Sequence, residues 1–108
     1  MKQFFLLTLL FLSSSFASAD PLSVKALAII ESSDCLACHS VDKKVVGPAF
    51  KDVAAKYKGN SKIVDTLVNK IKAGGSGNWG DIAMSPHPAL SNSDLKVVVN
   101  WILAGAVK

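Results

Sequence analysis

Cys35-Leu36-Ala37-Cys38-His39 is the stretch that decides the fold, and it contains both cysteines of the chain. The pattern C-x-x-C-H is the attachment motif for a c-type haem. Two thiols at this spacing can form thioether bonds to the two vinyl groups on one edge of a porphyrin. The next residue is then carried under the metal, where an imidazole becomes the proximal iron ligand. The motif therefore predicts one covalent haem c, bound through Cys35 and Cys38, with His39 as the proximal ligand of its iron.

Three other uses of the two cysteines compete with this interpretation. A thioredoxin-like redox disulfide lies beside a βαβ unit, and the chain has no strand pattern. A zinc site needs four ligands, whereas the only other histidine, His87, is isolated and far along the chain. A structural disulfide across two intervening residues would close a very small loop and stabilise little. The haem interpretation is favoured over all three.

The N-terminal residues have the pattern of a secretory signal peptide. Lys2 gives a basic start, an apolar run covers residues 4–12, and Ala17-Ser18-Ala19 forms an A-x-A end. The run is too short to cross a bilayer, which takes about 20 residues. A buried N-terminal helix is the alternative, but no polar face interrupts the run. We expect residues 1–19 to be cleaved after Ala19, residues 20–108 to form one monohaem domain, and the protein to work in the periplasm.

This mature domain is short of core-forming side chains. Removal of 19 residues from 108 leaves 89, and four of the five phenylalanines leave with the signal peptide. The remaining aromatic residues are Phe50, Tyr57, Trp79 and Trp101. A domain of this size buries a modest share of its surface and often needs a cofactor or another staple. A haem would supply the missing core.

Apolar side chains at helical spacing predict four helices and no strand. The helices are expected at about residues 22–33, 50–57, 61–73 and from Ser91 to near the C-terminus. Gly74 is expected to end the third of them. In the second helix the charged side chains are expected to face water: Lys51, Asp52 and Lys56. Val97 and Trp101 give the last helix a second apolar side, so we expect it to pack against more than one partner.

A Gly- and Pro-rich segment over residues 74–90 has no helical pattern. A loop of this length is unusual in so small a domain unless it encloses something. It holds Met84, the one methionine that the mature chain retains, and a thioether opposite an imidazole suits electron transfer. The alternatives are a gap-filling core role for Met84 and distal ligation by His87 instead. We predict Met84 as the distal iron ligand.

Together these residues resemble one family. Residues 22–108 are similar to the small bacterial class I cytochromes c of the c551/c552 type. Beyond C-x-x-C-H, the resemblance is carried by Val46-Gly47-Pro48-Ala49-Phe50-Lys51-Asp52-Val53-Ala54-Ala55-Lys56-Tyr57, Gly77-Asn78-Trp79-Gly80, Met84 and Trp101-Ile102-Leu103. It implies an all-α cytochrome c fold, with four to five helices wrapped around one haem. It also implies a single-electron carrier that is not an enzyme.

The resemblance further implies roles for single side chains. The backbone carbonyl of Pro48 would accept a hydrogen bond from His39. Trp79 would donate its indole N–H to a haem propionate, with plain core packing as the alternative. Lys70 stands where relatives often have an arginine near a propionate, and a solvated lysine is its alternative. Relatives usually follow the distal methionine with Pro-Pro-Asn, whereas this chain has His87 in the run Met84-Ser85-Pro86-His87-Pro88.

The charge of the chain bears on its partners. The net charge is +4, from 12 lysines and no arginine against 8 acidic residues. The lysines are spread along the chain with acids between them, which does not favour nucleic acid as a partner. Lys43 and Lys44 follow the haem motif and are expected to steer acidic redox partners, a donor and an acceptor such as a terminal reductase or oxidase.

Two other functions remain open at this stage. One is a haem enzyme or sensor with an open or bis-His site, and the other is a haem subunit of a larger oxidoreductase. No acid–base pair, nucleophile constellation or phosphate-binding loop favours an enzyme. The expectation is a monomer without a membrane span.

Overall fold

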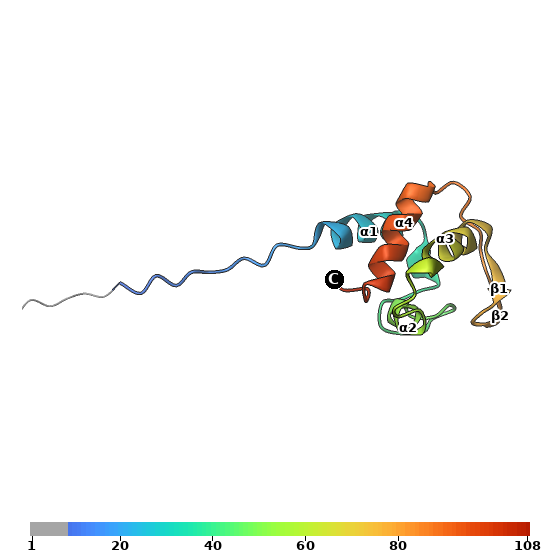
Figure 1. The fold of residues 1–108 in the computed structure, drawn as a ribbon, viewed down its shortest axis with the longest axis horizontal. Coiled ribbons are helices and arrows are strands. Elements are labelled where there is room, and N and C mark those ends of the chain that lie inside the picture. The colour runs from blue at the N-terminus through green and yellow to red at the C-terminus, as the bar shows by residue number, and fades with distance from the viewer. Residues whose placement is uncertain (1–8) are drawn as a thin grey trace, which may run out of the picture.

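Residues 9–108, which the computed structural model describes, form four α-helices and one small β-hairpin (Figure 1). The helices are α1 (Pro21–Ser32), α2 (Phe50–Lys56), α3 (Val64–Ala73) and α4 (Asn92–Leu103). Two short 3₁₀ helices are also present: η1 (Cys35–Ala37) shortly before His39 and η2 (Ser61–Ile63) directly before α3. The strands are β1 (Gly75–Gly77) and β2 (Gly80–Met84). The predicted helical fold is confirmed.

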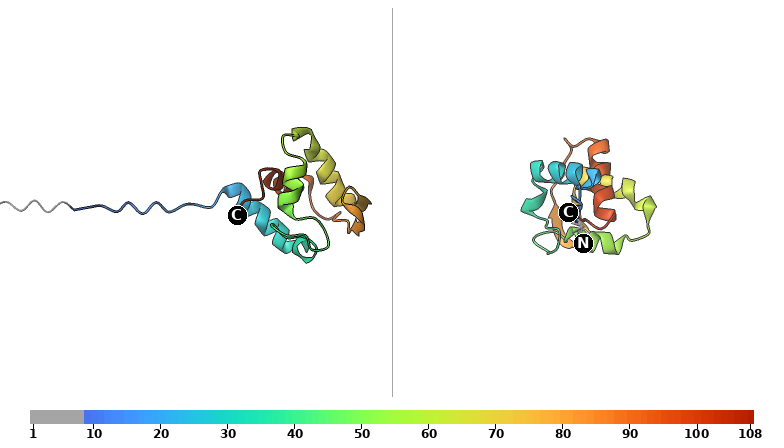
Figure 2. Two further views of the ribbon diagram at one scale, coloured as in Figure 1. Left: turned by 90° about the horizontal axis from the view of Figure 1, so that it is seen from below. Right: turned by 90° about the vertical axis from the view of Figure 1, so that its left-hand side faces the viewer.

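Helix α4 is the centre of the packing and contacts α1, α2 and α3 (Figure 2). Its Trp101 and Ile102 lie in one buried cluster with Ala26 and Ile30 of α1 and Phe50 of α2. A second cluster joins α4 to α3. Its buried members are Val68, Leu95 and Val99. The two apolar sides expected for the last helix therefore face different neighbours, as predicted.

Side chains cap the two long helices that pack on each other. Asp20 precedes α1 and accepts a hydrogen bond from the Ser23 backbone N–H at 3.3 Å. Ser91 precedes α4, and its Oγ accepts from the Asp94 N–H at 3.1 Å. Such caps satisfy N–H groups that have no partner within the helix.

The C-terminal residues close this helical pair. The Trp101 indole donates to the Val107 carbonyl at 2.8 Å, and the Ser23 hydroxyl donates to the same oxygen at 3.0 Å. Because Ser23 lies in the first turn of α1 and Trp101 in the last turn of α4, one carbonyl joins the end of the chain to both helices.

The expectation of no strand is wrong. The segment 75–84 folds back as an antiparallel hairpin in which Gly75 pairs with Met84 and Gly77 with Gly80. The three glycines have positive φ angles between 107° and 122°, a region that glycine adopts without steric cost. A hairpin made of glycines and exposed side chains has no alternation of apolar and polar residues, so the strand pattern was absent from the sequence.

The segment before α1 extends away from the helices (Figure 1). Within residues 9–19 the apolar side chains are exposed, and Phe16 is 92% exposed. Residues 1–8 of the predicted signal peptide lie outside the described residues. In the described part of the chain, every helix is too short or too polar to cross a membrane.

Candidate functional site

The two cysteines lie on a single tight turn. Asp34, with φ at 60°, breaks the path of α1, and η1 then carries the chain to Cys38. The His39 N–H donates to the Cys35 carbonyl at 2.9 Å, which closes the turn. Both thiols are free; Cys35 is half-buried and Cys38 is exposed. Burial raises the pKa of the free Cys35 thiol, and the Asp34 carboxylate adds to the effect.

The His39 ring is held in one orientation by Pro48 and Phe50. Its Nδ1 lies 2.7 Å from the carbonyl oxygen of Pro48. A carbonyl can only accept, so Nδ1 carries the proton and Nε2 keeps its lone pair. The ring stacks on Phe50 with centroids 5.2 Å apart, and Phe50 packs edge-on against Trp101 of α4 at 5.8 Å. The position of the imidazole is therefore tied to the helical core.

Gly47 allows the loop to pass directly beside this imidazole. A Cβ atom at position 47 would lie 2.5 Å from Cε1 of His39, closer than any real contact. The Gly47 N–H donates to the Cys38 carbonyl at 2.8 Å and fixes the loop there. The backbone of the loop thus lies directly against the His39 ring, and only glycine fits at this point.

Met84 ends strand β2 and is half-buried. The backbone there runs tightly past Gly74, the residue that ends α3 with φ at 69°. A Cβ on Gly74 would lie 2.4 Å from the Met84 carbonyl oxygen and 2.8 Å from the Pro86 nitrogen. The end of α3 therefore sets the backbone position of Met84.

His87 is bound to the same end of α3. Its backbone N–H donates to the Ile71 carbonyl at 3.0 Å. In the described residues its Nδ1 is the one buried side-chain nitrogen or oxygen without a hydrogen-bond partner. Burial of an unpaired polar atom is costly, so a partner that the polypeptide does not supply, such as a water molecule or a bound group, would stabilise this nitrogen.

Trp79 and Lys70 lie on and beside the hairpin. Trp79, at its tip, is 43% exposed, so core packing does not describe it. The Lys70 ammonium reaches back toward the hairpin, to 3.5 Å from where a Cβ of Gly75 would stand. Lys56 is exposed, as predicted, and its Nζ also lies 4.5 Å from the centre of the Trp79 ring. The sequence did not predict this contact, since it depends on how α2 and the hairpin meet in space.

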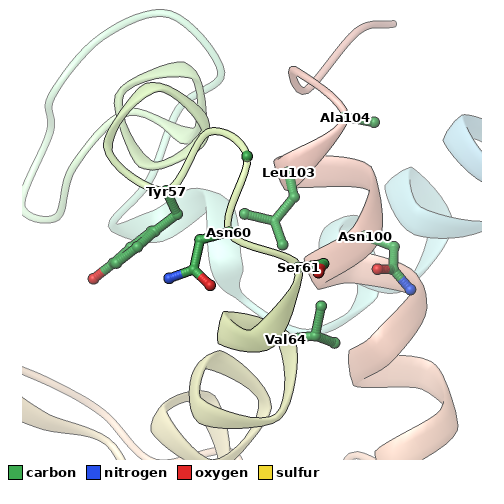
Figure 3. A pocket seen from close by; sticks show the side chains of 8 residues that line it. Tyr57, Asn60, Ser61, Val64, Asn100, Leu103 and Ala104 are labelled. Atoms are coloured by element: carbon green, nitrogen blue, oxygen red, sulfur yellow. The ribbon is translucent and has the colours of Figure 1, made fainter.

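An open surface pocket lies elsewhere, between the residues around η2 and the end of α4 (Figure 3). It contains none of the predicted site residues. Its lining is Tyr57, Gly59, Asn60, Ser61, Val64, Asn100, Leu103 and Ala104. These side chains offer no thiol, imidazole or thioether, so this pocket is not the haem site.

The contacts of three residues, Gly47, Gly74 and Lys56, are not predicted by the sequence. The sequence indicates Gly74 only as the end of a helix. The roles of the two glycines depend on a backbone or ring from a different segment that approaches where a side chain would stand. No local sequence pattern predicts such a close contact between distant segments.

Comparisons with known proteins agree on one family. The family model described as cytochrome c matches residues 24–106. Cytochrome c-551 of Allochromatium vinosum is 47% identical over 83 residues, which are 77% of this chain and 88% of that protein. Cytochrome c-551 of Azotobacter vinelandii is 55% identical over 69 residues, 64% of this chain and 83% of that protein. The crystal structure of Nitrosomonas europaea cytochrome c552 covers 72% of this chain and 96% of its own, with 45% identity and a TM-score of 0.68.

A cytochrome c of this kind carries one covalent haem c with its iron, and the residues here fit that group. The two free thiols lie on one turn, and His39 presents an oriented imidazole nitrogen beside them. The backbone cradle at Gly47 and the unpaired buried nitrogen of His87 are features that a bound group would explain. From its family match, its relatives and the fit of these residues, the chain belongs to the cytochrome c family, as a class I electron carrier of the c551/c552 type.

Proposed function

We propose that this cytochrome is exported to the periplasm and carries single electrons on a haem whose iron is held by His39 and Met84. The haem would be bound through Cys35 and Cys38. One observation carries the proposal: Nδ1 of His39, directly after the two thiols, is engaged by the Pro48 carbonyl at 2.7 Å. An iron-ligating histidine needs this second contact, because it fixes the tautomer and the ring plane and makes the other nitrogen a stronger donor.

Met84 is the proposed distal ligand. A thioether is a soft, neutral donor, and the haem iron with a His/Met pair serves outer-sphere electron transfer at a raised reduction potential. The chain's own contribution is to hold the sulfur in place, since Gly74 fixes the backbone of Met84 from one side. The hydrogen bond from His87 to the Ile71 carbonyl fixes the same segment three residues later.

Trp79 and Lys70 are the proposed propionate partners. The Trp79 indole has no hydrogen-bond acceptor among the described residues, so its N–H is free to donate. Lys70 is half-buried at the base of the hairpin, with its ammonium group near Gly75. An N–H donor and a cation are the groups that bind a carboxylate such as a haem propionate.

The proposal that the protein is exported is supported by where the extended N-terminal segment ends and the first helix begins. Asp20, the first residue after the proposed cleavage site, is also the residue that caps α1. Cleavage after Ala19 would therefore leave the first helix with its cap. Within the removed segment, residues 9–19 have no regular structure. Attachment of the haem outside the cytoplasm agrees with this order of events.

The proposed docking face for redox partners surrounds the haem motif. Lys43 and Lys44 are exposed there, and apolar side chains beside them are exposed as well. These are Leu36 at 48%, Val45 at 53% and Val46 at 44%. An apolar patch with a rim of lysines is suited to brief encounters with acidic proteins, in which charge raises the association rate.

Redox titration of the exported protein tests this proposal. We expect a mass equal to residues 20–108 plus one haem, one reversible single-electron step, and little binding of carbon monoxide to the reduced protein. Rapid binding of carbon monoxide would instead indicate an open site, as in a haem enzyme or sensor. Retention of residues 1–19 in the periplasmic protein would contradict the cleavage.

His87 is the rival for the distal position, and the variants Met84→Ala and His87→Ala separate the two. We expect Met84→Ala to bind carbon monoxide readily and His87→Ala to resist it as the wild type does. The reverse result would assign the distal position to His87.

A further inference from the structure

The β-hairpin is the least supported part of the fold. Every residue of β1 and β2 is exposed except Met84, which is half-buried. Its regular hydrogen bonds run between its own two strands, and its base is fixed at the end of α3. A two-stranded hairpin of this size is marginal without further contacts. Something must therefore hold its tip if β2 is to keep a fixed position.

Lys56, the last residue of α2, contacts this tip in two ways. Its Nζ donates a hydrogen bond of 2.9 Å to the carbonyl of Asn78. The same ammonium lies 4.5 Å from the centre of the Trp79 ring and 5.6 Å from that of Tyr57. One cation therefore joins the end of α2 to a residue 22 positions later in the chain.

These contacts reinforce each other physically. A lysine ammonium near the face of a tryptophan is attracted by the ring quadrupole, and the attraction fixes the plane of the ring. The hydrogen bond to Asn78 is charge-assisted, which makes it stronger than a bond between neutral groups. Because Asn78 and Trp79 form the turn between β1 and β2, both contacts act on the turn itself.

We propose that Lys56 is a positioning residue that fastens the hairpin tip to α2, sets the plane of the Trp79 ring and thereby steadies the strand that carries Met84. The inference deepens the proposed function and rests on it for the role of Met84. The contact between Lys56 and the hairpin tip does not depend on that role.

Lys58 supplies a matched control. It lies two residues beyond Lys56 and is exposed, and its side chain makes no ion pair, hydrogen bond or aromatic contact within residues 9–108. Replacement of either lysine by methionine removes one positive charge from the same end of α2. A difference between the two variants therefore reports the contact and not the net charge.

The experiment compares Lys56→Met, Lys56→Arg and Lys58→Met in the exported, haem-loaded protein by nuclear magnetic resonance. In Lys56→Met we expect the indole resonance of Trp79 to move and the amides of the tip to exchange about two- to fivefold faster. The Trp101 indole, buried in the helical core, is the internal reference and is expected to stay unchanged. Lys56→Arg should preserve most of the wild-type behaviour, because a guanidinium can make both contacts.

A second readout connects the tip to Met84. We expect added imidazole to displace Met84 from the oxidised iron faster in Lys56→Met, by the same two- to fivefold, and at the wild-type rate in Lys58→Met. An unmoved Trp79 resonance, or equal effects of Lys56→Met and Lys58→Met, would overturn the inference. If the wild type shows no methionine ligation, the proposed function fails, while the Trp79 resonance and the tip amides still decide the role of Lys56.

Discussion

The helical pair α1/α4 and the hairpin differ in how the rest of the polypeptide stabilises them. In the pair, Ile30 and Trp101 are at most 1% exposed, and Ser23 and Trp101 share the Val107 carbonyl. In the hairpin, every strand residue except Met84 is exposed, and glycines with positive φ flank the turn. The polypeptide packs the first region by itself, whereas the second has too few apolar side chains to do so. From this difference we expect the haem to supply the packing that the hairpin lacks.

The largest expected effect comes from removal of the thioether bonds. The double variant Cys35→Ala/Cys38→Ala cannot bind haem covalently. We expect its hairpin amides to lose their protection from hydrogen exchange and its thermal unfolding to lose the sharp transition. The reason is that a small domain that folds around a cofactor gains much of its stability from that cofactor. Hydrogen exchange and circular dichroism measure both effects. Leu36→Ala, within the same turn, should keep the haem and the transition. A haem-free variant with a fully protected hairpin would contradict the comparison of the two regions.

Substitution of each tryptophan tests the same difference between the helical pair and the hairpin. Trp101→Ala should lower the free energy of unfolding by about 3–5 kcal/mol, because it leaves a large cavity in the helical core. Trp79→Ala, at the exposed tip, should cost only about 1 kcal/mol. Denaturant unfolding of both variants measures the difference. Equal losses would show that the hairpin is a part of the core.

A third prediction concerns the two glycines Gly74 and Gly80. Both have positive φ, which alone costs alanine roughly 1–2 kcal/mol. Only at Gly74 does a new Cβ meet backbone, the Met84 carbonyl. We therefore expect Gly74→Ala to lose about 1–3 kcal/mol more than Gly80→Ala and also to shift the reduction potential. Potentiometry and thermal unfolding test this, and an unchanged potential in Gly74→Ala would argue against control of Met84 by the end of α3.

The smallest expected effect is at the surface. The ion pair with Lys51, at 2.7 Å, holds the pKa of Asp42 below its usual range. A lowered pKa in the folded state adds stability above the unfolded pKa, about 3.9, and this contribution is lost as the pH falls through the folded value. Asp42→Asn should therefore be slightly less stable than the wild type at pH 7, but not at pH about 2.

Salt and a second substitution check the ion-pair explanation. Both side chains are more than half exposed, so added salt should reduce the difference. In a Lys51→Met background, Asp42→Asn should have no further effect. A loss that persists at pH about 2 would show that the ion pair is not its cause.

The helices and the proximal site were accessible from the sequence because their signals are local. The spacing of Cys35, Cys38 and His39 specifies the turn itself, and an apolar stripe specifies each helix. The cap at Ser91 and the two-sided packing of α4 also follow from neighbouring residues.

The hairpin and its contacts were not accessible in this way. Glycines that adopt positive φ carry no apolar pattern, so β1 and β2 were read as an irregular loop. The position of Lys56 over Trp79 requires α2 and the hairpin to meet in space, as do the close approaches at Gly47 and Gly74. Such contacts between distant segments follow from the assembled fold and not from any short stretch of residues.

The near-infrared edge of the visible spectrum of the oxidised protein tests the central proposal most directly. A bond between the Met84 sulfur and the ferric iron gives a weak sulfur-to-iron charge-transfer band. We predict this band in the wild type and in His87→Ala, and its loss in Met84→Ala. A wild type without the band, or a band that survives in Met84→Ala, would contradict the assignment of His39 and Met84 as the iron ligands.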